Sequence, residues 1–184
     1  MDNTSGTFSF SRNKQGFTLI ETMITIAIVA IMTAIALPSL NNFIVQMRVD
    51  NEVNELQRLL LTARNAAINS SQNAQLCPLK ANDTCKPTTD WSGRIGVISI
   101  DGLIKEKSAI STGDKLTFTS QSVTYDPSGR SDNAALITFK YCPKSDTDYA
   151  RGVSLSISGR SYLSADINGD GKDQDRAGAT ITCP

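Results

Sequence analysis

The stretch FTLIETMITIAIVAIMTAIAL, residues 17–37, decides the fold class of this 184-residue chain. Sixteen of its residues are apolar, and Glu21 is its one charged residue. At about 1.5 Å per residue, a helix of this length measures roughly 31 Å, which matches the hydrocarbon core of a bilayer. A core helix of a soluble protein seldom runs this far without a polar face, and a secretory signal has a shorter apolar core followed by a cleavage site. We therefore predict a membrane-spanning helix.

The charges on either side indicate the orientation of this helix. Residues 1–16 are polar and carry Arg12 and Lys14 near their end. After Glu21, the next charged residue is Arg48. Because positive charges before a span favour a cytoplasmic amino terminus, we expect the carboxyl-terminal bulk of the chain to lie outside the cytoplasm.

The junction between leader and span reads KQGFTLIE over residues 14–21 and closely resembles the type III signal of type IV pilins and pseudopilins. The resemblance implies that residues 1–16 are a leader peptide. It also implies that a prepilin peptidase cuts between Gly16 and Phe17, and that Phe17 is then N-methylated.

Glu21 places a carboxylate inside the predicted span. Transfer of a carboxylate into hydrocarbon costs several kcal/mol unless the group is paired or neutralised. The family resemblance implies a partner, the freed amino group of Phe17 on a neighbouring subunit, and a role in setting the register of subunits that enter a filament. Alternatively, Glu21 lies at headgroup depth in the first helical turn, where the helix dipole favours an acid.

Beyond the span, Pro38 is expected to kink the helix, since its ring clashes with the preceding turn and removes one backbone hydrogen bond. Apolar residues then recur at spacings of three and four, which predicts an amphipathic helix. They are Val45, Val49, Val53, Leu56, Leu60, Ala63 and Ala67. We assign residues 17–38 to the transmembrane half of one long helix and residues 39–72 to its amphipathic half.

From Trp91 onward, short runs rich in β-branched and aromatic residues alternate with Gly, Pro, Asp and Ser, as in strands joined by turns. The candidate strands are residues 94–100, 103–107, 116–120, 122–125, 134–141, 152–158 and 160–165. Residues 73–184 are therefore predicted to form a globular β-rich domain. The predicted fold class is α+β, with the long N-terminal helix packed on a mainly antiparallel β-sheet domain.

Three segments of this domain resemble the FimT, FimU and GspH group of minor pilins and pseudopilins. They are WSGRIGV at residues 91–97, YDPSGR at 125–130 and VSLSISGR at 153–160. Each is also explained by structure alone, as a core tryptophan, a proline-primed turn with glycine at positive φ, and a strand with its turn. We therefore interpret them as marks of a fold rather than of a site.

The resemblance implies a minor pilin that takes part in assembly of a type IV pilus, at or near the tip. A GspH-like pseudopilin of type II secretion and a FimT-like DNA-uptake pilin are the alternatives. The implied partners are other minor and major pilins and the prepilin peptidase. The implied location is a single pass through the inner membrane with a periplasmic carboxyl-terminal domain, followed by the pilus at the cell surface.

The four cysteines are Cys77, Cys85, Cys142 and Cys183, all in the part expected outside the cytoplasm. An even number in an oxidising compartment predicts two disulfides, for which three pairings exist. Local closure favours Cys77 with Cys85 and Cys142 with Cys183. A zinc site built from the four thiolates is the alternative, although the chain has no Cys-x-x-Cys pair.

The loop Asp166-Ile167-Asn168-Gly169-Asp170-Gly171 reproduces the first half of a calcium-binding pattern, with oxygen ligands at alternate positions. The position expected to supply the bidentate acid is Ala177. A calcium site would therefore use Asp166, Asn168 and Asp170, with Asp175 or Asp173 as the substitute acid. A solvated turn is the alternative, because exposed turns favour the same residue types.

Composition argues against catalysis and against nucleic-acid binding. The chain has no histidine, which removes the commonest general base and the histidine-containing metal sites. Lys plus Arg and Asp plus Glu each total 18, so no global basic excess exists to hold a nucleic acid. We predict that the chain is not an enzyme and requires no cofactor, and we do not expect DNA to be a partner.

Overall fold

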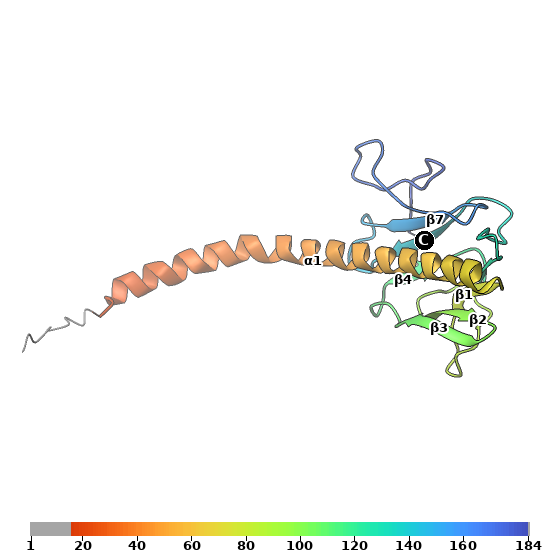
Figure 1. Cartoon of the computed structure of the whole chain (residues 1–184). Coiled ribbons are helices and arrows are strands. Elements are labelled where there is room, and N and C mark those ends of the chain that lie inside the picture. Colours follow the sequence, from red (N-terminus) through yellow and green to blue (C-terminus); the bar gives the residue numbers. More distant parts are fainter. Residues whose placement is uncertain (1–15, 184) are drawn as a thin grey trace, which may run out of the picture. The chain divides into compact units, whose positions relative to one another are not determined.

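The computed structural model describes residues 16–183, apart from the side chains of residues 38 and 39. The chain divides into two compact units, Met1–Leu40 and Asn41–Pro184. Helix α1, Leu19–Ser70, contributes residues to both units, and eight strands follow it (Figure 1). Residues 1–15 of the predicted leader lie outside the described part of the chain.

In the first unit, α1 satisfies its own polar groups. The side-chain oxygen of Thr18 accepts a hydrogen bond from the Glu21 backbone N–H at 3.3 Å and so caps the helix. The hydroxyls of Thr22, Thr25 and Thr33 donate to helix carbonyls at 2.7, 2.9 and 2.9 Å. Because the polar side chains described between residues 18 and 37, apart from Glu21, bond within the helix, this segment suits an apolar environment.

The helix continues through Pro38, so proline does not end it. Proline removes one backbone donor but leaves the rest of the ladder in place, and neighbouring turns keep the helix going. The kink expected at this position stays a prediction, since the two units are described separately.

In the second unit, α1 packs through the stripe predicted from its spacing. Val49, Val53, Leu56, Leu60, Ala63 and Ala67 are all buried, and Val45 is partly buried against the same core. Leu59 joins them, which widens the buried face beyond the predicted positions. This amphipathic half therefore serves as the core helix of a water-soluble domain.

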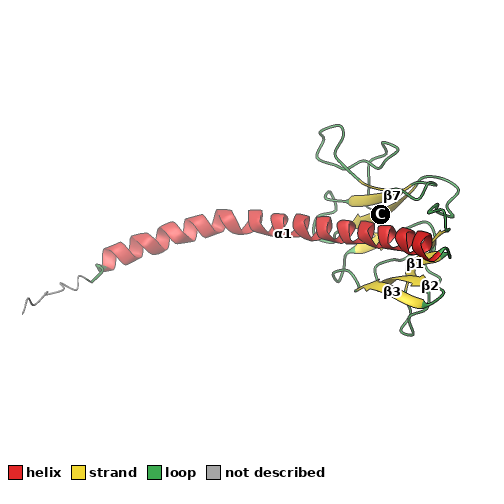
Figure 2. Cartoon of the chain, viewed as in Figure 1, coloured by secondary structure: helices red, strands yellow, loops and turns green. Residues whose placement is uncertain are grey.

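The strands form two antiparallel sheets of four strands each, shown in yellow in Figure 2. The first sheet has the order β3-β2-β1-β5, and the second has the order β4-β6-β7-β8. The bounds are β1 Ala74–Pro78, β2 Ile95–Ser99, β3 Gly102–Lys107, β4 Lys115–Thr117, β5 Val123–Tyr125, β6 Ile137–Cys142, β7 Arg151–Leu155 and β8 Ser161–Leu163. The α+β class is confirmed, with a division into two sheets that the sequence pattern did not reveal, because β4 and β5 are adjacent in the chain but belong to different sheets.

Strand β1 is absent from the strands predicted from the sequence, the first of which begins at residue 94. Its residues, AQLCP, include weak strand formers and end in proline, so the usual signal is absent. Pairing with strands on both sides compensates for the low strand propensity of this segment. Gln75 lies between Ile98 of β2 and Thr124 of β5, which makes β1 an inner strand of the first sheet.

An aromatic cluster lies in the shared core. Trp91 meets Phe118 and Phe139 edge to face, with ring centroids 5.5 and 4.9 Å away. Its indole N–H donates to the Ser120 carbonyl at 3.0 Å, so the one polar atom of the ring is satisfied. The interpretation of this tryptophan as a core residue is confirmed.

Two glycine turns pack directly on one another. Gly129 and Gly159 both have φ of +76°, a conformation that side chains with a Cβ rarely adopt. A Cβ on Gly159 would lie 2.0 Å from the carbonyl oxygen of Gly129. The same carbonyl accepts a hydrogen bond from Nε of Arg64 on α1 at 3.0 Å. These contacts fasten the late hairpin, the earlier turn and the helix at one point.

Replacing Gly159 by alanine should therefore destabilise the second unit more than replacing Gly169, which has the same φ of +76° but nothing within 4 Å of its would-be Cβ. We expect a loss of about 1 kcal/mol for Gly169→Ala from backbone strain alone, and of about 3 kcal/mol for Gly159→Ala from strain plus the clash. Urea unfolding of the soluble domain measures both. Equal losses would show that the close approach of the two turns contributes nothing.

Candidate assembly interface

The predicted processing site lies just before α1. Phe17 is 82% exposed, and Glu21 lies in the first helical turn with an exposed side chain. Within residues 16–183, no cation comes within ion-pairing distance of Glu21 in the single chain. An acid in such apolar surroundings therefore needs a partner from outside the described chain, or a position near the headgroups.

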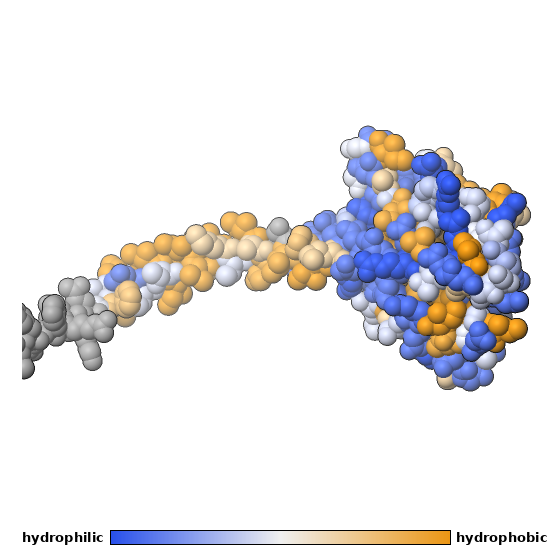
Figure 3. All heavy atoms as spheres, in the orientation of Figure 1, coloured by the Kyte–Doolittle hydropathy of each residue, from blue (hydrophilic) through white to orange (hydrophobic). Residues whose placement is uncertain are grey.

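The first half of α1 presents an unusually large apolar surface. Figure 3 shows this surface in orange along the helix, in contrast to the largely blue surface of the second unit. Large apolar side chains are exposed from Phe17 to Met47, among them Leu19, Ile20, Met23, Ile24, Ile26, Ile31, Met32 and Ile35. Among the described helices, α1 alone is long and apolar enough to cross a membrane. Lipid or the helices of other subunits must cover such a surface.

The packed half of α1 is tied to the sheets by buried charges. Arg48 pairs with Asp114, whose side chain is almost fully buried, at 3.2 Å. The Tyr141 hydroxyl donates to the same carboxylate at 2.7 Å. Burial, together with the bonded carboxylate, raises the pKa of Tyr141, so its hydroxyl stays protonated and keeps donating.

Two further ion pairs connect this part of the helix to strands β3 and β7. Glu52 pairs with Lys107 of β3 at 2.5 Å, and this lysine is only 4% exposed. Asp50 pairs with Arg151 of β7 at 3.5 Å. Both sheets are thus joined to the helix by ion pairs, and the pair with Glu52 compensates the buried charge of Lys107.

Both disulfides favoured from the sequence are present. Cys77 is bonded to Cys85, and Cys142 is bonded to Cys183. The first closes the loop after β1, and the second ties the carboxyl-terminal segment to β6, where Ile181 is buried beside Cys142. No thiolate is left for zinc, so the zinc alternative is wrong.

The acidic loop uses its carboxylates to hold its own backbone. Asp166 accepts hydrogen bonds from the backbone N–H groups of Gly169 at 2.7 Å and Gly171 at 2.9 Å. The backbone N–H of Lys172 and the side-chain amide of Asn168 lower the pKa of Asp170. These bonds are typical of a closed polar turn.

The two acids considered as substitute calcium ligands make other contacts. Asp175 accepts hydrogen bonds from the backbone of Ala177 and Ala179, both at 2.9 Å, and so closes a separate turn. Asp173 is buried and pairs with Arg151. Between residues 16 and 183, no three acidic or thiol side chains are grouped closely enough to hold a metal ion.

Two features together define the pilin and pseudopilin class: a sequence that resembles a Gly-Phe cleavage signal, and after it an exposed apolar helix that continues into the core of an antiparallel β domain. Comparison with known families agrees. Residues 11–37 match the prokaryotic N-terminal methylation motif, and residues 52–159 match the family described as type II transport protein GspH. Since the second match spans more than half of the chain, the chain belongs to the GspH family.

Solved structures that match this chain include proteins of two bacteria. Two crystal forms of the type IV minor pilin FimU of Pseudomonas aeruginosa match 62% of this chain, and 87% and 90% of their own, with TM-scores of 0.53 and 0.51 and identities of 20% and 21%. The minor pseudopilin EpsH from the type 2 secretion system of Vibrio cholerae matches 63% of this chain and 95% of its own, with a TM-score of 0.45 and 16% identity. At this identity, the FimU likeness shows the fold.

Removal of the disulfides should destabilise the second unit unequally. In the loop-entropy view, the 41-residue separation of Cys142 and Cys183 corresponds to about 4 kcal/mol, and the 8-residue separation of Cys77 and Cys85 to about 2.5 kcal/mol. Double serine variants of each pair, compared by urea unfolding, test this order. Non-reducing peptide mapping of periplasmic protein should recover the two links, and any other pairing would contradict the structure.

Proposed function

We propose that the chain is a minor pilin, a subunit that takes part in assembly of a type IV pilus at or near its tip. The observation that carries this proposal is the division of α1 into an exposed apolar half and a half that forms the core of a folded domain. A protein that acted alone in water would have no use for the first half. A protein that only needed an anchor would have no use for the cleavage signal at its start.

In this proposal, the inner membrane holds the chain through residues 17–38 until it is extracted into a filament. The prepilin peptidase acts on it first, and other minor and major pilins are its later partners. The domain of residues 73–184 together with the second half of α1 lies in the periplasm, and then at the cell surface as part of the pilus. Charge placement before the span and disulfides after it support this orientation.

The mature protein should begin at N-methylated Phe17. Intact-mass measurement of protein extracted from its native membrane checks this directly, because loss of residues 1–16 and gain of one methyl group are both resolved. A chain that retains residues 1–16, or one that begins near Asn41, would contradict the pilin proposal.

Glu21→Gln should leave cleavage and membrane insertion intact but lower the incorporation of the chain into filaments. The amide keeps the size and hydrogen-bonding capacity of the side chain and removes only the charge that would meet the amino group of Phe17 on a neighbouring subunit. Asp101→Asn, which neutralises an exposed acid in the second unit, is the matched control. Unchanged filament yield and unchanged recovery of neighbouring subunits would remove the pairing role from Glu21.

A pseudopilin of type II secretion is the second candidate, and the description of the matched family favours it. The two candidates share the anchor, the processing step and the fold, and they differ in the assembly that receives the subunit. Co-purification with pilus fibres sheared from cells supports the pilus. Loss of protein secretion without loss of pili, on deletion of the chain, supports the pseudopilin.

The proposed role is structural and requires neither catalysis nor a cofactor. In this proposal, the free energy that favours assembly comes from burial of the apolar half of α1 among other subunits. We assign no calcium to the acidic loop, because its carboxylates are occupied by the backbone bonds described above.

DNA capture is the functional alternative that local charge disfavours. Three basic side chains of the carboxyl-terminal region already have partners: Arg151 with Asp50 and Asp173, Lys172 with Asp148, and Arg176 with the ring of Tyr162. Arg160 is exposed, and its turn packs on the turn that carries Arg130, a second exposed arginine. Two exposed arginines neutralise few phosphates.

We therefore expect the soluble domain to bind duplex DNA no tighter than the non-specific range, roughly 10⁻⁴ to 10⁻⁶ M at physiological salt. A fluorescence-polarisation titration at two salt concentrations measures this. Sub-micromolar, salt-sensitive binding that is lost in an Arg130→Ala, Arg160→Ala double variant would make a DNA receptor the better description.

A further inference from the structure

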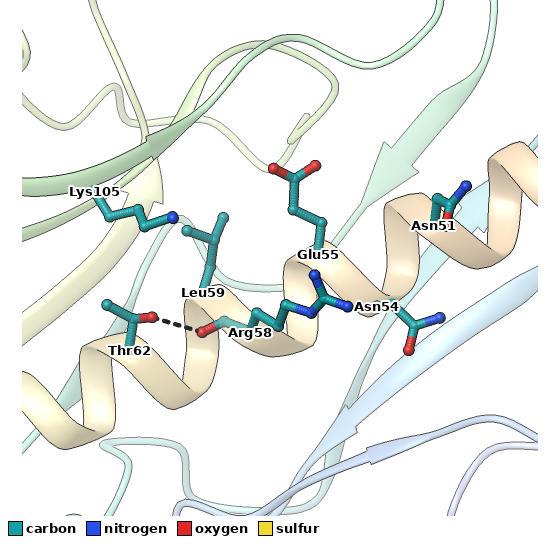
Figure 4. Close-up of a pocket in the computed structure, with 7 residues that line it drawn as sticks. All are labelled: Asn51, Asn54, Glu55, Arg58, Leu59, Thr62 and Lys105. Carbon is teal, nitrogen blue, oxygen red and sulfur yellow. Dashed lines mark hydrogen bonds between the residues drawn. The ribbon is translucent and has the colours of Figure 1, made fainter.

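A groove runs between the exposed flank of α1 and strand β3, with a volume of about 490 Å³. Its lining is Asn51, Asn54, Glu55, Arg58, Leu59, Thr62 and Lys105. Figure 4 shows Lys105 extending from β3 above Leu59, with Glu55 one helical turn away on the same side. The buried Leu59 gives the groove an apolar floor, and the other residues give it polar walls.

Strand β3 borders this groove as the outer strand of the first sheet. It pairs with β2 on one side, and in the described chain no strand pairs with its other side. Its residues from Leu103 to Glu106 are exposed, including Ile104 at 47%. The unpaired backbone groups of such an edge are a template for an added strand.

The charges of the groove are not balanced within the described chain. Arg58 and Lys105 have no ion-pair partner among residues 16–183. Glu55 is the one acid of the lining, and it already lies 3.7 Å from the buried Lys107. Two exposed cations thus line the groove beside one carboxylate whose ion-pair partner is Lys107, which favours an anionic occupant.

Hydrogen-bonding capacity points to a peptide rather than to a small ion. Asn54 donates to the Asp50 carbonyl, and Thr62 donates to the Arg58 carbonyl, so both side-chain oxygens stay available as acceptors. Acceptors on the helix wall and main-chain groups on the β3 edge match the donors and acceptors that alternate along an extended backbone.

We propose that this groove receives an extended, acidic segment from a neighbouring subunit of the same assembly. The segment adds to the free edge of β3, and an Asp or Glu side chain lies between Arg58 and Lys105. The proposal rests on the proposed role in filament assembly and specifies the surface of the second unit through which a neighbour is held. It gives the second unit a contact of its own, beside the contacts of the apolar helix.

The test uses the full chain in cells that build the assembly. The photoreactive residue p-benzoylphenylalanine replaces Asn51 in the groove or, as a control, Thr182, which is exposed outside it. Irradiation at Asn51 should link the chain to another subunit with a methylation-type leader, through a peptide that contains Asp or Glu. Position 182 should give no such product.

Charge reversal supplies the matched comparison. Arg58→Glu with Lys105→Glu should lower the yield of the Asn51 crosslink about fivefold, because attraction becomes repulsion at a partly exposed contact. Lys80→Glu with Lys86→Glu makes the same change in net charge on an exposed surface elsewhere and should leave the yield unchanged. If the reversal variant has a lowered melting temperature, the neutral pair Arg58→Gln with Lys105→Gln replaces it.

The possible results separate the two proposals. If the chain enters the assembly but the crosslink is absent, joins an unrelated protein, or is insensitive to Arg58 and Lys105, the groove proposal is overturned and the assembly role stands. If the wild-type chain is absent from purified pili and from secretion filaments alike, the assembly role is overturned and the groove proposal with it.

Discussion

Helix α1 is one continuous helix whose first half suits apolar surroundings and whose second half lies in a water-soluble domain. The rest of the structure depends on this division. Over the first half of α1 most side chains are apolar and exposed, and the threonine hydroxyls donate hydrogen bonds to carbonyls of the helix itself. Over its second half the same ladder carries a narrow apolar stripe, from Val49 to Ala67, that two sheets cover. The sheets give the second half its water-soluble surface, and the first half is left for lipid or for other subunits.

Sequence periodicity was sufficient to predict the long-range organisation of this helix. The run of residues 17–37 gives its apolar half, and the three-and-four spacing after Val45 gives the buried face that the structure confirms. Seven of the eight strands were also expected within a few residues of their bounds. These features are local, so a single segment contains the whole signal.

Features that depend on distant partners could not be predicted in the same way. Strand β1 has little strand propensity and forms because two better strands lie on either side of it. Glu52 lies outside the apolar stripe of the helix, and it pairs with Lys107, which only the folded sheet brings to it. At the candidate site, the sequence motif predicts the processing position and the role of Glu21. The groove beside β3 could not be predicted from the sequence, because only the folded chain brings Lys105 close to α1.

The spacing of the ion pairs along α1 also has a mechanical meaning. Arg48, Asp50 and Glu52 occupy alternate positions at the start of the packed half, and they reach Asp114 before β4, Arg151 on β7 and Lys107 on β3. A pull applied to the amino-terminal end of the helix meets these contacts, together with Val45 and Val49 of the apolar stripe, before it meets the rest of that stripe. Because they are anchored in both sheets, the load is divided between them, and the contacts are strained side by side instead of being peeled apart one after another. A subunit drawn out of a bilayer, or held in a fibre under tension, would keep its fold for that reason.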